Sequence, residues 1–429
     1  MIPALRRWLH RHRYPQRYAH LDRLLAHQAL DRAALLEKQQ GDFAAIVRHA
    51  AAHVPYYTRR LGDLTGWDGS VESLPVLTKE DVRNHLDDLL DRDADRAHVD
   101  VGHTGGSTGH PLAFWYDEAK HELMRAGMMR GFMMSGWRPG RKVLYLWGAR
   151  QDVGKDGVFG QRLADALAGE RTVAALEFTE ERLAGWAELM RRWRPSLLYG
   201  YASALTELAR YVADRDLAMP DSLMGVYSTA EMLLDEPRAL MARAFGCKVF
   251  NQYGCREVPN IAWECLHGGM HVMADLVHLE SVHLDGENRL LVTSLTNRLM
   301  PFIRYELGDA GRLLEGECPC GSPFPLMEMG MCRHNDLIRT PDGRRVHPAV
   351  FNRLLYGLTQ IRQYQWRQVA PDCMALDLVC SPPLDAALVA RLEAGLRAEV
   401  DPAMTLEVNY RTEIPRTASG KHRYIIGLG

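Results

Sequence analysis

The chain has 429 residues, a formal net charge of −2, 47% hydrophobic residues and 25% charged residues. This length allows more than one domain with its own core, and the composition is that of an ordinary globular protein. The near-neutral charge argues against a nucleic-acid-binding protein. No apolar run is long enough to span a bilayer, and arginines interrupt residues 1–20 where a signal peptide would need apolar residues, so we expect a cytoplasmic protein.

Short apolar runs alternate with helical patterns along the chain. Leu and Ala recur at helical spacing over 18–50, and a Pro-containing break follows at 53–57. Short runs rich in β-formers predict strands at 142–147, 196–199, 290–295, 373–380 and 405–410. Helical spacing predicts helices at 180–193, 203–214 and 384–400. Such alternation is typical of an α/β protein.

A glycine-rich loop, HTGGSTGHP, occupies 103–111. Glycines allow tight turns that point backbone N–H groups inward, and hydroxyl side chains add donors, which together suit phosphate oxygens. The loop lacks the Lys-Ser or Lys-Thr pair of a Walker loop and the spacing of a dinucleotide fingerprint. A flexible surface loop is the alternative. The donors concerned are Thr104, Gly105, Gly106, Ser107, Thr108 and Gly109.

Five ordered segments resemble motifs of the acyl-adenylate-forming superfamily. The loop at 103–111 resembles its phosphate loop, NQYGCRE at 251–257 its Tyr-Gly-x-x-Glu motif, and RYELGD at 304–309 its Arg-Tyr-x-x-Gly-Asp motif. The segment 333–348 resembles its hinge region, and PRTASGKHR at 415–423 its C-terminal lysine motif.

Three further segments narrow the resemblance to one family. LPVLTKEDVR at 74–83, PSLLYGYASAL at 195–205 and YGCREVPNIAWEC at 253–265 are similar to the phenylacetate–CoA ligase family. Within it, they look closest to the subgroup associated with capsular polysaccharide biosynthesis. The resemblance implies a large N-terminal adenylate-forming domain over 1–332, with β-sheets flanked by helices. It also implies a small mobile α+β domain over 333–429 that carries a catalytic lysine.

The resemblance also implies the chemistry. A carboxylate attacks the α-phosphorus of ATP, and because two anions must approach, the site needs Mg²⁺ and fixed donors. Glu257 is the expected Mg²⁺ ligand, since Mg²⁺ prefers oxygen. Lys421 is expected to neutralise the developing charge, and Thr104 to act in the phosphate loop. As plain sequence features, Glu257 and Lys421 would be surface charges.

Nucleotide contacts follow from the same resemblance. Asp309 and Arg333 are expected to contact the ribose, because a carboxylate can accept from both hydroxyls. Tyr253 is expected to pack on the adenine or the acyl group, with a core tyrosine as the alternative. Asp336 matches the hinge about which the small domain rotates. The remaining ATP contacts are expected around the adenine, at Thr229, Ala230 and Glu231.

Aromatic and small residues that precede Glu257 are candidates for an acyl pocket. They are Trp147, Tyr199, Tyr201, Ala202 and Tyr227. Ordinary core packing is an equally good interpretation of each.

Three of the eight cysteines and one histidine suggest a metal site. Cys265 and His271 form one half-site, and Cys318 and Cys320, in a Cys-Pro-Cys-Gly turn, form the other. Three thiolates and one imidazole make a closed tetrahedral structural zinc site. His267 is the alternative imidazole, and unliganded thiols are the alternative to zinc.

The sequence therefore predicts an AMP-forming acid–thiol ligase. It would use ATP, Mg²⁺ and a structural Zn²⁺, activate an aryl or other apolar acid, and pass the acyl group to coenzyme A or to carrier-protein phosphopantetheine. Nucleic acid is not an expected partner, and a homodimer is left open. The alternatives are an adenylating amide- or ester-forming enzyme of envelope or capsule biosynthesis, and an inactive nucleotide-binding homologue.

Overall fold

A computed structural model describes residues 3–104, 112–147, 169–175, 178–284, 287–333, 338–342, 345–346, 349–355, 358, 360–415 and 422–428. The chain begins with helices α1 (Pro3–Arg13), α2 (Pro15–Gln28), α3 (Arg32–His53), α4 (Pro55–Leu61) and α5 (Lys79–Asn84). The stretch 18–50, expected as one helix, is divided between α2 and α3. The division falls at Asp31, whose carboxylate accepts from the amide of Ala34 at 2.8 Å and so caps α3.

Five parallel strands form the centre of the protein. They are β3 (Val143–Trp147), β4 (Glu170–Ala174), β5 (Leu197–Tyr201), β6 (Gly225–Thr229) and β7 (Lys248–Tyr253), in the order β7-β6-β5-β3-β4. Every residue of β5 and β6 is buried, as expected for parallel strands that are covered on both faces.

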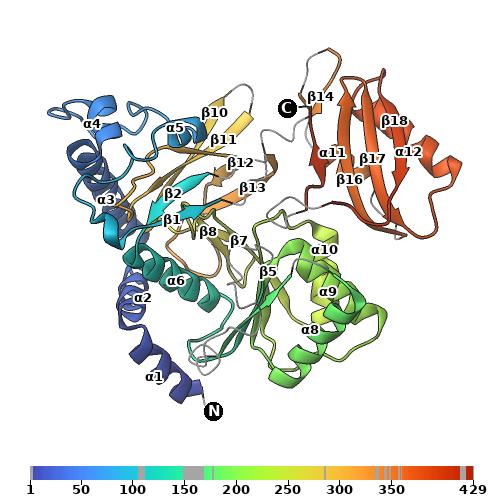
Figure 1. Ribbon diagram of the computed structural model, residues 1–429, viewed down its shortest axis with the longest axis horizontal. Helices are drawn as coiled ribbons and strands as arrows, with labels where there is room; N and C mark the ends of the chain where they lie inside the picture. The colour runs from blue at the N-terminus through green and yellow to red at the C-terminus, as the bar shows by residue number, and fades with distance from the viewer. Residues whose placement is uncertain are drawn as a thin grey trace.

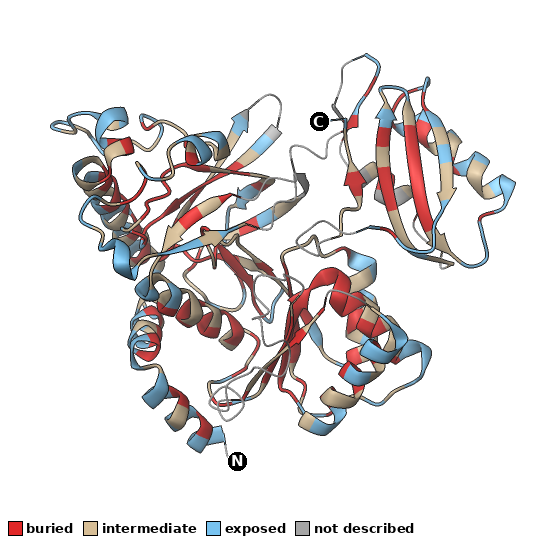
Figure 2. Ribbon diagram, in the orientation of Figure 1, coloured by how far each residue is buried: buried red, intermediate tan, exposed pale blue. Residues whose placement is uncertain are grey.

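Helices cover the two faces of these strands (Figure 1). Helices α8 (Glu180–Trp193), α9 (Ala202–Asp214) and α10 (Asp235–Phe245) pack on the face that carries Leu144 and Leu146. Helix α6 (Glu118–Met133) packs on the opposite face, which carries Tyr145 and Tyr199. Alternate side chains of one strand thus enter two separate cores, which Figure 2 shows as buried residues on both sides of the sheet.

The same sheet continues on its other side with antiparallel strands. These are β8 (Ala262–Glu264), β9 (Met270–Val272), β10 (Val277–Leu284), β11 (Glu287–Ser294), β12 (Tyr305–Leu314) and β13 (Leu326–Arg333). The described residues thereby form an 11-stranded mixed sheet. A separate hairpin, β1 (Asp100–His103) and β2 (Ala113–Tyr116), precedes α6 in the chain.

The C-terminal part of the chain has its own sheet and its own core. Strands β16 (Ile361–Ala370), β17 (Cys373–Cys380), β18 (Thr405–Tyr410) and β19 (Ile425–Ile426) form a four-stranded sheet in the order β18-β17-β16-β19. Strands β14 (Ile338–Arg339) and β15 (Arg345–Val346) and helices α11 (Ala349–Leu354) and α12 (Ala386–Glu399) complete it. Its buried apolar cluster is drawn entirely from residues between Ile338 and Ile425, and Figure 1 shows this part beside α10.

The α/β class predicted from the sequence is confirmed, and the C-terminal part holds the expected small sheet. The helices expected at 180–193, 203–214 and 384–400 correspond to α8, α9 and α12, and the strand expected at 373–380 is β17. In the described part of the chain, no helix combines the length and apolar character needed to cross a membrane.

Candidate active site

The predicted site residues gather where the parallel strands end. Trp147 ends β3, Tyr201 ends β5, Thr229 ends β6 and Tyr253 ends β7, so all four lie at the carboxyl edge of the sheet. In open α/β sheets, ligands bind in the crevice outside this edge. The loops that follow these strands carry the other candidates.

Two tyrosine–carboxylate hydrogen bonds join the loop after β7 to strand β12. The hydroxyl of Tyr253 donates to Oδ2 of Asp309 at 3.0 Å, and the hydroxyl of Tyr305 donates to Oε1 of Glu257 at 2.9 Å. Each segment supplies one tyrosine and one carboxylate. Two motifs about fifty residues apart in sequence therefore form one unit, with both carboxylates held by neutral donors.

Glu257 is buried, and its second carboxylate oxygen, Oε2, has no hydrogen-bond partner among the described residues. An ionised oxygen buried without a partner costs more than a neutral one, so the position favours a cation. An oxygen ligand of this kind suits Mg²⁺. Burial, reinforced by the Glu257 charge, raises the pKa of Tyr305 far above its usual value, which keeps that hydroxyl a donor.

Lys120 of α6 lies beside Glu257, although no motif in the sequence singles it out. Its ammonium donates to the main-chain oxygen of Glu257 at 2.9 Å and lies 4.8 Å from the ring centroid of Phe114. Burial lowers the pKa of Lys120 to about 8, and the Glu257 carboxylate opposes that shift. The ammonium thus places positive charge next to the proposed metal ligand.

The described ends of the glycine-rich loop are held against the same region. The amide of Thr104 donates to Leu112 O at 2.8 Å, and the amide of Leu112 donates to Oγ1 of Thr104 at 2.9 Å. The guanidinium of Arg256 donates to His103 O at 3.1 Å, which ties strand β1 to the residue before Glu257. The loop therefore starts and ends next to the Glu257 segment.

Thr229, Ala230 and Glu231 follow strand β6 directly. The hydroxyl of Thr229 hydrogen-bonds to Gln252 of the neighbouring strand. Ala230 has a φ of +66°, an unusual conformation for a residue with a Cβ. Glu231 accepts from the amide and hydroxyl of Ser203, at 2.7 and 3.0 Å, and from the amide of His422 at 2.7 Å.

Three of the aromatic candidates for the acyl pocket lie in contact with one another. The ring centroids of Trp147 and Tyr199 are 5.6 Å apart and nearly parallel, and Tyr201 lies 5.1 Å from Trp147. Ala202 begins α9 beside them and is buried. Tyr227 lies deeper, where its hydroxyl donates to the main-chain oxygens of Gly131 and Glu264. In this structure Tyr227 is a core residue, while Trp147 is the half-buried member of the group.

Several predicted residues cannot be placed. Gly105, Gly106, Ser107, Thr108, Gly109, Asp336 and Lys421 lie outside the described residues. Arg333 is described by its backbone, which pairs with Asp309 across β12 and β13.

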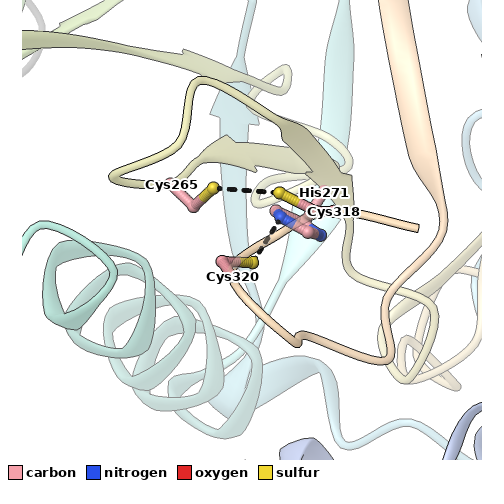
Figure 3. A group of neighbouring side chains, drawn as sticks. All are labelled: Cys265, His271, Cys318 and Cys320. Atoms are coloured by element: carbon pink, nitrogen blue, oxygen red, sulfur yellow. Dashed lines mark hydrogen bonds between the residues drawn. The ribbon is translucent and has the colours of Figure 1, made fainter.

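The four predicted zinc ligands do come together. Sγ of Cys265 lies 3.6 Å from Sγ of Cys318, and Sγ of Cys320 lies 3.2 Å from Nε2 of His271, as Figure 3 shows. All four ligand atoms lie within 4.8 Å of one another. Two thiolates that share a tetrahedral zinc would be about 3.8 Å apart, given a Zn–S distance of about 2.3 Å. The residues present therefore fit zinc.

The surroundings of this cluster also fit a metal. Nδ1 of His271 lies 3.2 Å from Phe324 O, so an Nδ1–H donor leaves Nε2 available as a ligand. Burial lowers the pKa of His271, which favours the neutral imidazole that metals bind. A Cβ at Gly269 would lie 2.9 Å from Sγ of Cys318, so the turn needs glycine. His267, the alternative ligand, contributes its amide to Sγ of Cys265 at 3.4 Å.

Comparison with known proteins finds relatives in sequence and in fold. No family model matches the chain. The chain is 24% identical to protein CapK of Staphylococcus aureus, over 83% of this chain and 80% of CapK. It is also 24% identical to the phenylacetate-coenzyme A ligase of Thermus thermophilus, over 94% of this chain and 98% of that enzyme. 2-Hydroxyisobutyryl-CoA ligase in the postadenylation state has the same fold, with a TM-score of 0.72, 17% identity, and coverage of 94% of this chain and 91% of that one.

The chain resembles the phenylacetate–CoA ligase family of the adenylate-forming superfamily, in sequence and in fold. It is homologous to AMP-forming acid–CoA ligases, and the family implies ATP and coenzyme A as ligands. Sequence reasoning selected the carboxylates Glu257 and Asp309 as candidates, and the structure brings their two segments together. Sequence reasoning did not predict that tyrosine hydroxyls hold these carboxylates. The clearest case is Tyr305, which is the second residue of the Arg-Tyr-x-x-Gly-Asp motif and donates to Glu257.

Proposed function

We propose that the protein activates a carboxylic acid with ATP to an enzyme-bound acyl-AMP and transfers the acyl group to a thiol. The acceptor would be coenzyme A or carrier-protein phosphopantetheine. One observation carries the proposal: Glu257 presents a buried, unpartnered carboxylate oxygen at the carboxyl edge of the parallel strands. The hydrogen bonds from Tyr305 to Glu257 and from Tyr253 to Asp309 hold the two motifs next to each other.

In this proposal each group at the edge has one task. Glu257 holds Mg²⁺, which would screen the charge on the phosphates while the carboxylate approaches. Asp309 accepts from the ribose hydroxyls, with Arg333 beside it, and Tyr253 packs on the nucleotide. The residues 104–109 bind the phosphates, and those after β6, 229–231, lie at the adenine.

The C-terminal part supplies the other half of the mechanism. We propose domains over 1–332 and 333–429, with rotation about Asp336 between adenylation and thiol transfer. Lys421 would stabilise the charge that develops while pyrophosphate leaves, and would be remote from the thiol step. The separate core of the C-terminal sheet supports this division, because a part that packs on itself can move as a unit.

The acid is proposed to be aryl or otherwise apolar. Trp147 and Tyr201 end their strands at the carboxyl edge of the sheet, Trp147 stacks on Tyr199, and the small residue Ala202 follows Tyr201. Aromatic rings of this kind bury apolar ligand surface effectively. The Cys265, His271, Cys318 and Cys320 cluster is proposed to hold a structural zinc, since it has four protein ligands and so no open position for substrate.

A panel of carboxylic acids tests the proposal. Purified protein, ATP and Mg²⁺ are combined with aryl, branched aliphatic, linear aliphatic and polar acids, and pyrophosphate release is measured. We expect acid-dependent release that clusters among apolar acids. The best acid is then offered coenzyme A, a carrier protein or simple amines, which separates a thiol ligase from an amide-forming enzyme. Absence of acid-dependent release across the panel would contradict the proposal and favour a nucleotide-binding protein without chemistry.

A further inference from the structure

Glu231 connects the large sheet to the C-terminal part of the protein. It lies in the loop between β6 and α10, and its Oε1 accepts from the amide of His422 at 2.7 Å. His422 itself is fastened to the C-terminal sheet, because its ring nitrogen Nε2 lies 2.9 Å from Tyr364 O of β16. The hydrogen bond therefore joins two parts of the protein that have separate cores.

The other hydrogen bonds of Glu231 within the described residues come from Ser203 of α9, which packs on the large sheet. The amide of Ser203 donates to Oε2 at 2.7 Å, and the Ser203 hydroxyl donates to Oε1 at 3.0 Å. Ser203 is in the first turn of α9, whose N-cap residue Tyr201 provides no side-chain cap. The carboxylate thus satisfies an amide at the start of the helix, where a negative charge is also favourable.

These contacts make the carboxylate a preformed acceptor. If the C-terminal part moved away, the two bonds from Ser203 would remain and keep the side chain in place, while only the bond from His422 would break. The backbone before Glu231 supports this arrangement, since Ala230 adopts a φ of +66°. Such conformations cost roughly 1–3 kcal/mol and are found where the surrounding structure requires a particular geometry.

We propose that Glu231 is a positioning residue that holds the chain just after Lys421 in register for adenylation. This inference rests on the proposed function, in which Lys421 acts in the first half-reaction. His422 follows Lys421 directly in the sequence, so a bond to its backbone amide fixes the main chain next to the lysine without depending on the His422 side chain. The bond must break before the C-terminal part can rotate for thiol transfer.

The first test measures the contact itself and needs no substrate. Hydrogen–deuterium exchange of peptides covering 411–428 is compared in the wild-type protein, Glu231→Ala and Ser203→Ala. The control, Ser203→Ala, removes one donor to Glu231 but leaves the His422 contact. We expect exchange at 422 to accelerate about tenfold or more in Glu231→Ala, as for loss of a hydrogen bond to a charged group, and to stay near wild type in Ser203→Ala.

The second test measures the consequence, with the best acid from the panel. With ATP and acyl-AMP each at saturating concentration, so that a contact of Glu231 with the adenine does not limit either rate, we expect Glu231→Ala to form acyl-AMP about ten- to a hundredfold more slowly. Under the same conditions, thioester formation from supplied acyl-AMP should stay near the wild-type rate. Glu231→Gln keeps one amide oxygen as an acceptor and should fall between the two proteins. This rescue would not be expected if the residue only filled space.

Two results would overturn the inference. Unchanged exchange at 422 in Glu231→Ala would show that Glu231 does not hold the segment. Faster exchange together with an equal loss of rate in both half-reactions would mean that Glu231 only caps helix α9. If the wild-type protein activates no acid at all, the proposed function fails, and the exchange experiment still decides separately whether Glu231 anchors the C-terminal part.

Discussion

The hydroxyl of Tyr305 donates to one oxygen of the Glu257 carboxylate at 2.9 Å, and the other oxygen of that carboxylate is buried without a partner. The hydrogen bond from Tyr305 fixes the position of the carboxylate through one oxygen and leaves the second oxygen available to a ligand. A carboxylate held in this way need not reorganise when a metal ion binds. The hydroxyl of Tyr253 holds the Asp309 carboxylate in the same way, so a variant of Tyr253 provides a matched control for a variant of Tyr305.

Tyr305→Phe should weaken the response to Mg²⁺. Without the hydroxyl, Glu257 loses its anchor and is left as a buried carboxylate, at a cost of about 1.5–3 kcal/mol in the free energy of unfolding. We expect the Mg²⁺ concentration for half-maximal acyl-AMP formation to rise severalfold. Tyr253→Phe should instead raise the KM for ATP. Equal Mg²⁺ responses in both folded variants would argue against Glu257 as the metal ligand.

Replacing a glycine of the glycine-rich loop with a residue that has a side chain should weaken the binding of ATP. Gly106→Val and Gly109→Val are expected to raise the KM for ATP about tenfold or more, a loss of about 1.4 kcal/mol in binding, because the side chain obstructs the approach of the backbone. Gly185→Val is the control, since a Cβ there would meet nothing within 4 Å. Initial rates over a range of ATP concentrations measure the effect. Wild-type ATP dependence in both loop variants would mean that the phosphates bind elsewhere.

The protein should contain about one zinc ion per chain. Cys318→Ser together with Cys320→Ser should abolish zinc binding and lower the melting temperature, because metal binding to such a site contributes directly to folding. Cys373→Ser changes a cysteine of β17 outside the cluster and should retain zinc. Elemental analysis of protein never exposed to chelators provides the measurement. Zinc-free wild-type protein would remove the metal from the account.

A buried ion pair attaches the helix that carries Lys120 to the sheet. Arg130 of α6 donates two hydrogen bonds to Asp275, at 2.7 and 2.8 Å, and His27 lies 3.1 Å from the same carboxylate. Burial acts to raise the pKa of Asp275, but Arg130 and His27 outweigh it and lower the pKa from 3.8 to about 2. Because the folded-state pKa is below the unfolded value, this stabilisation is present above pH 3.8 and is lost as pH falls towards 2.

Arg130→Met should therefore cost about 3–5 kcal/mol in the free energy of unfolding at neutral pH, because it leaves Asp275 buried and unpaired. Part of that loss should be recovered in the double variant Arg130→Met with Asp275→Leu. Urea denaturation between pH 2 and pH 7 measures both effects. The single variant should also lose the decline in stability between pH 4 and pH 2 that this pair causes. An Arg130→Met protein as stable as wild type would contradict the structural role.

The sequence predicted local features well, since those depend on neighbouring residues. Strands β3 and β5 and the helices α8, α9 and α12 follow from the spacing of apolar residues and from turn residues between them, whereas β4, β6 and β7 were not predicted. The division of 18–50 into two helices was missed because Leu and Ala continue at helical spacing on both sides of Asp31. The amide of Ala34 donates to the carboxylate of Asp31, which caps α3 and separates it from α2.

The contacts between distant segments could not be predicted. Tyr305 and Glu257 are adjacent because the fold brings strand β12 next to the loop after β7. No local sequence pattern specifies this contact. Lys120 lies beside Glu257 only because α6 packs across that sheet. The cluster of Cys265, His271, Cys318 and Cys320 was predictable since paired cysteines carry their own spacing signal, whereas an isolated lysine carries none.

The central claim is a two-step reaction in which Lys421 acts only in the first step. The decisive measurement compares both half-reactions in Lys421→Ala, with the best acid from the panel. Acyl-AMP formation should fall by orders of magnitude, in line with loss of an electrostatic contact worth about 3–4 kcal/mol. Thioester formation from supplied acyl-AMP should stay near the wild-type rate. An equal loss in both steps, or no loss in the first, would contradict the account.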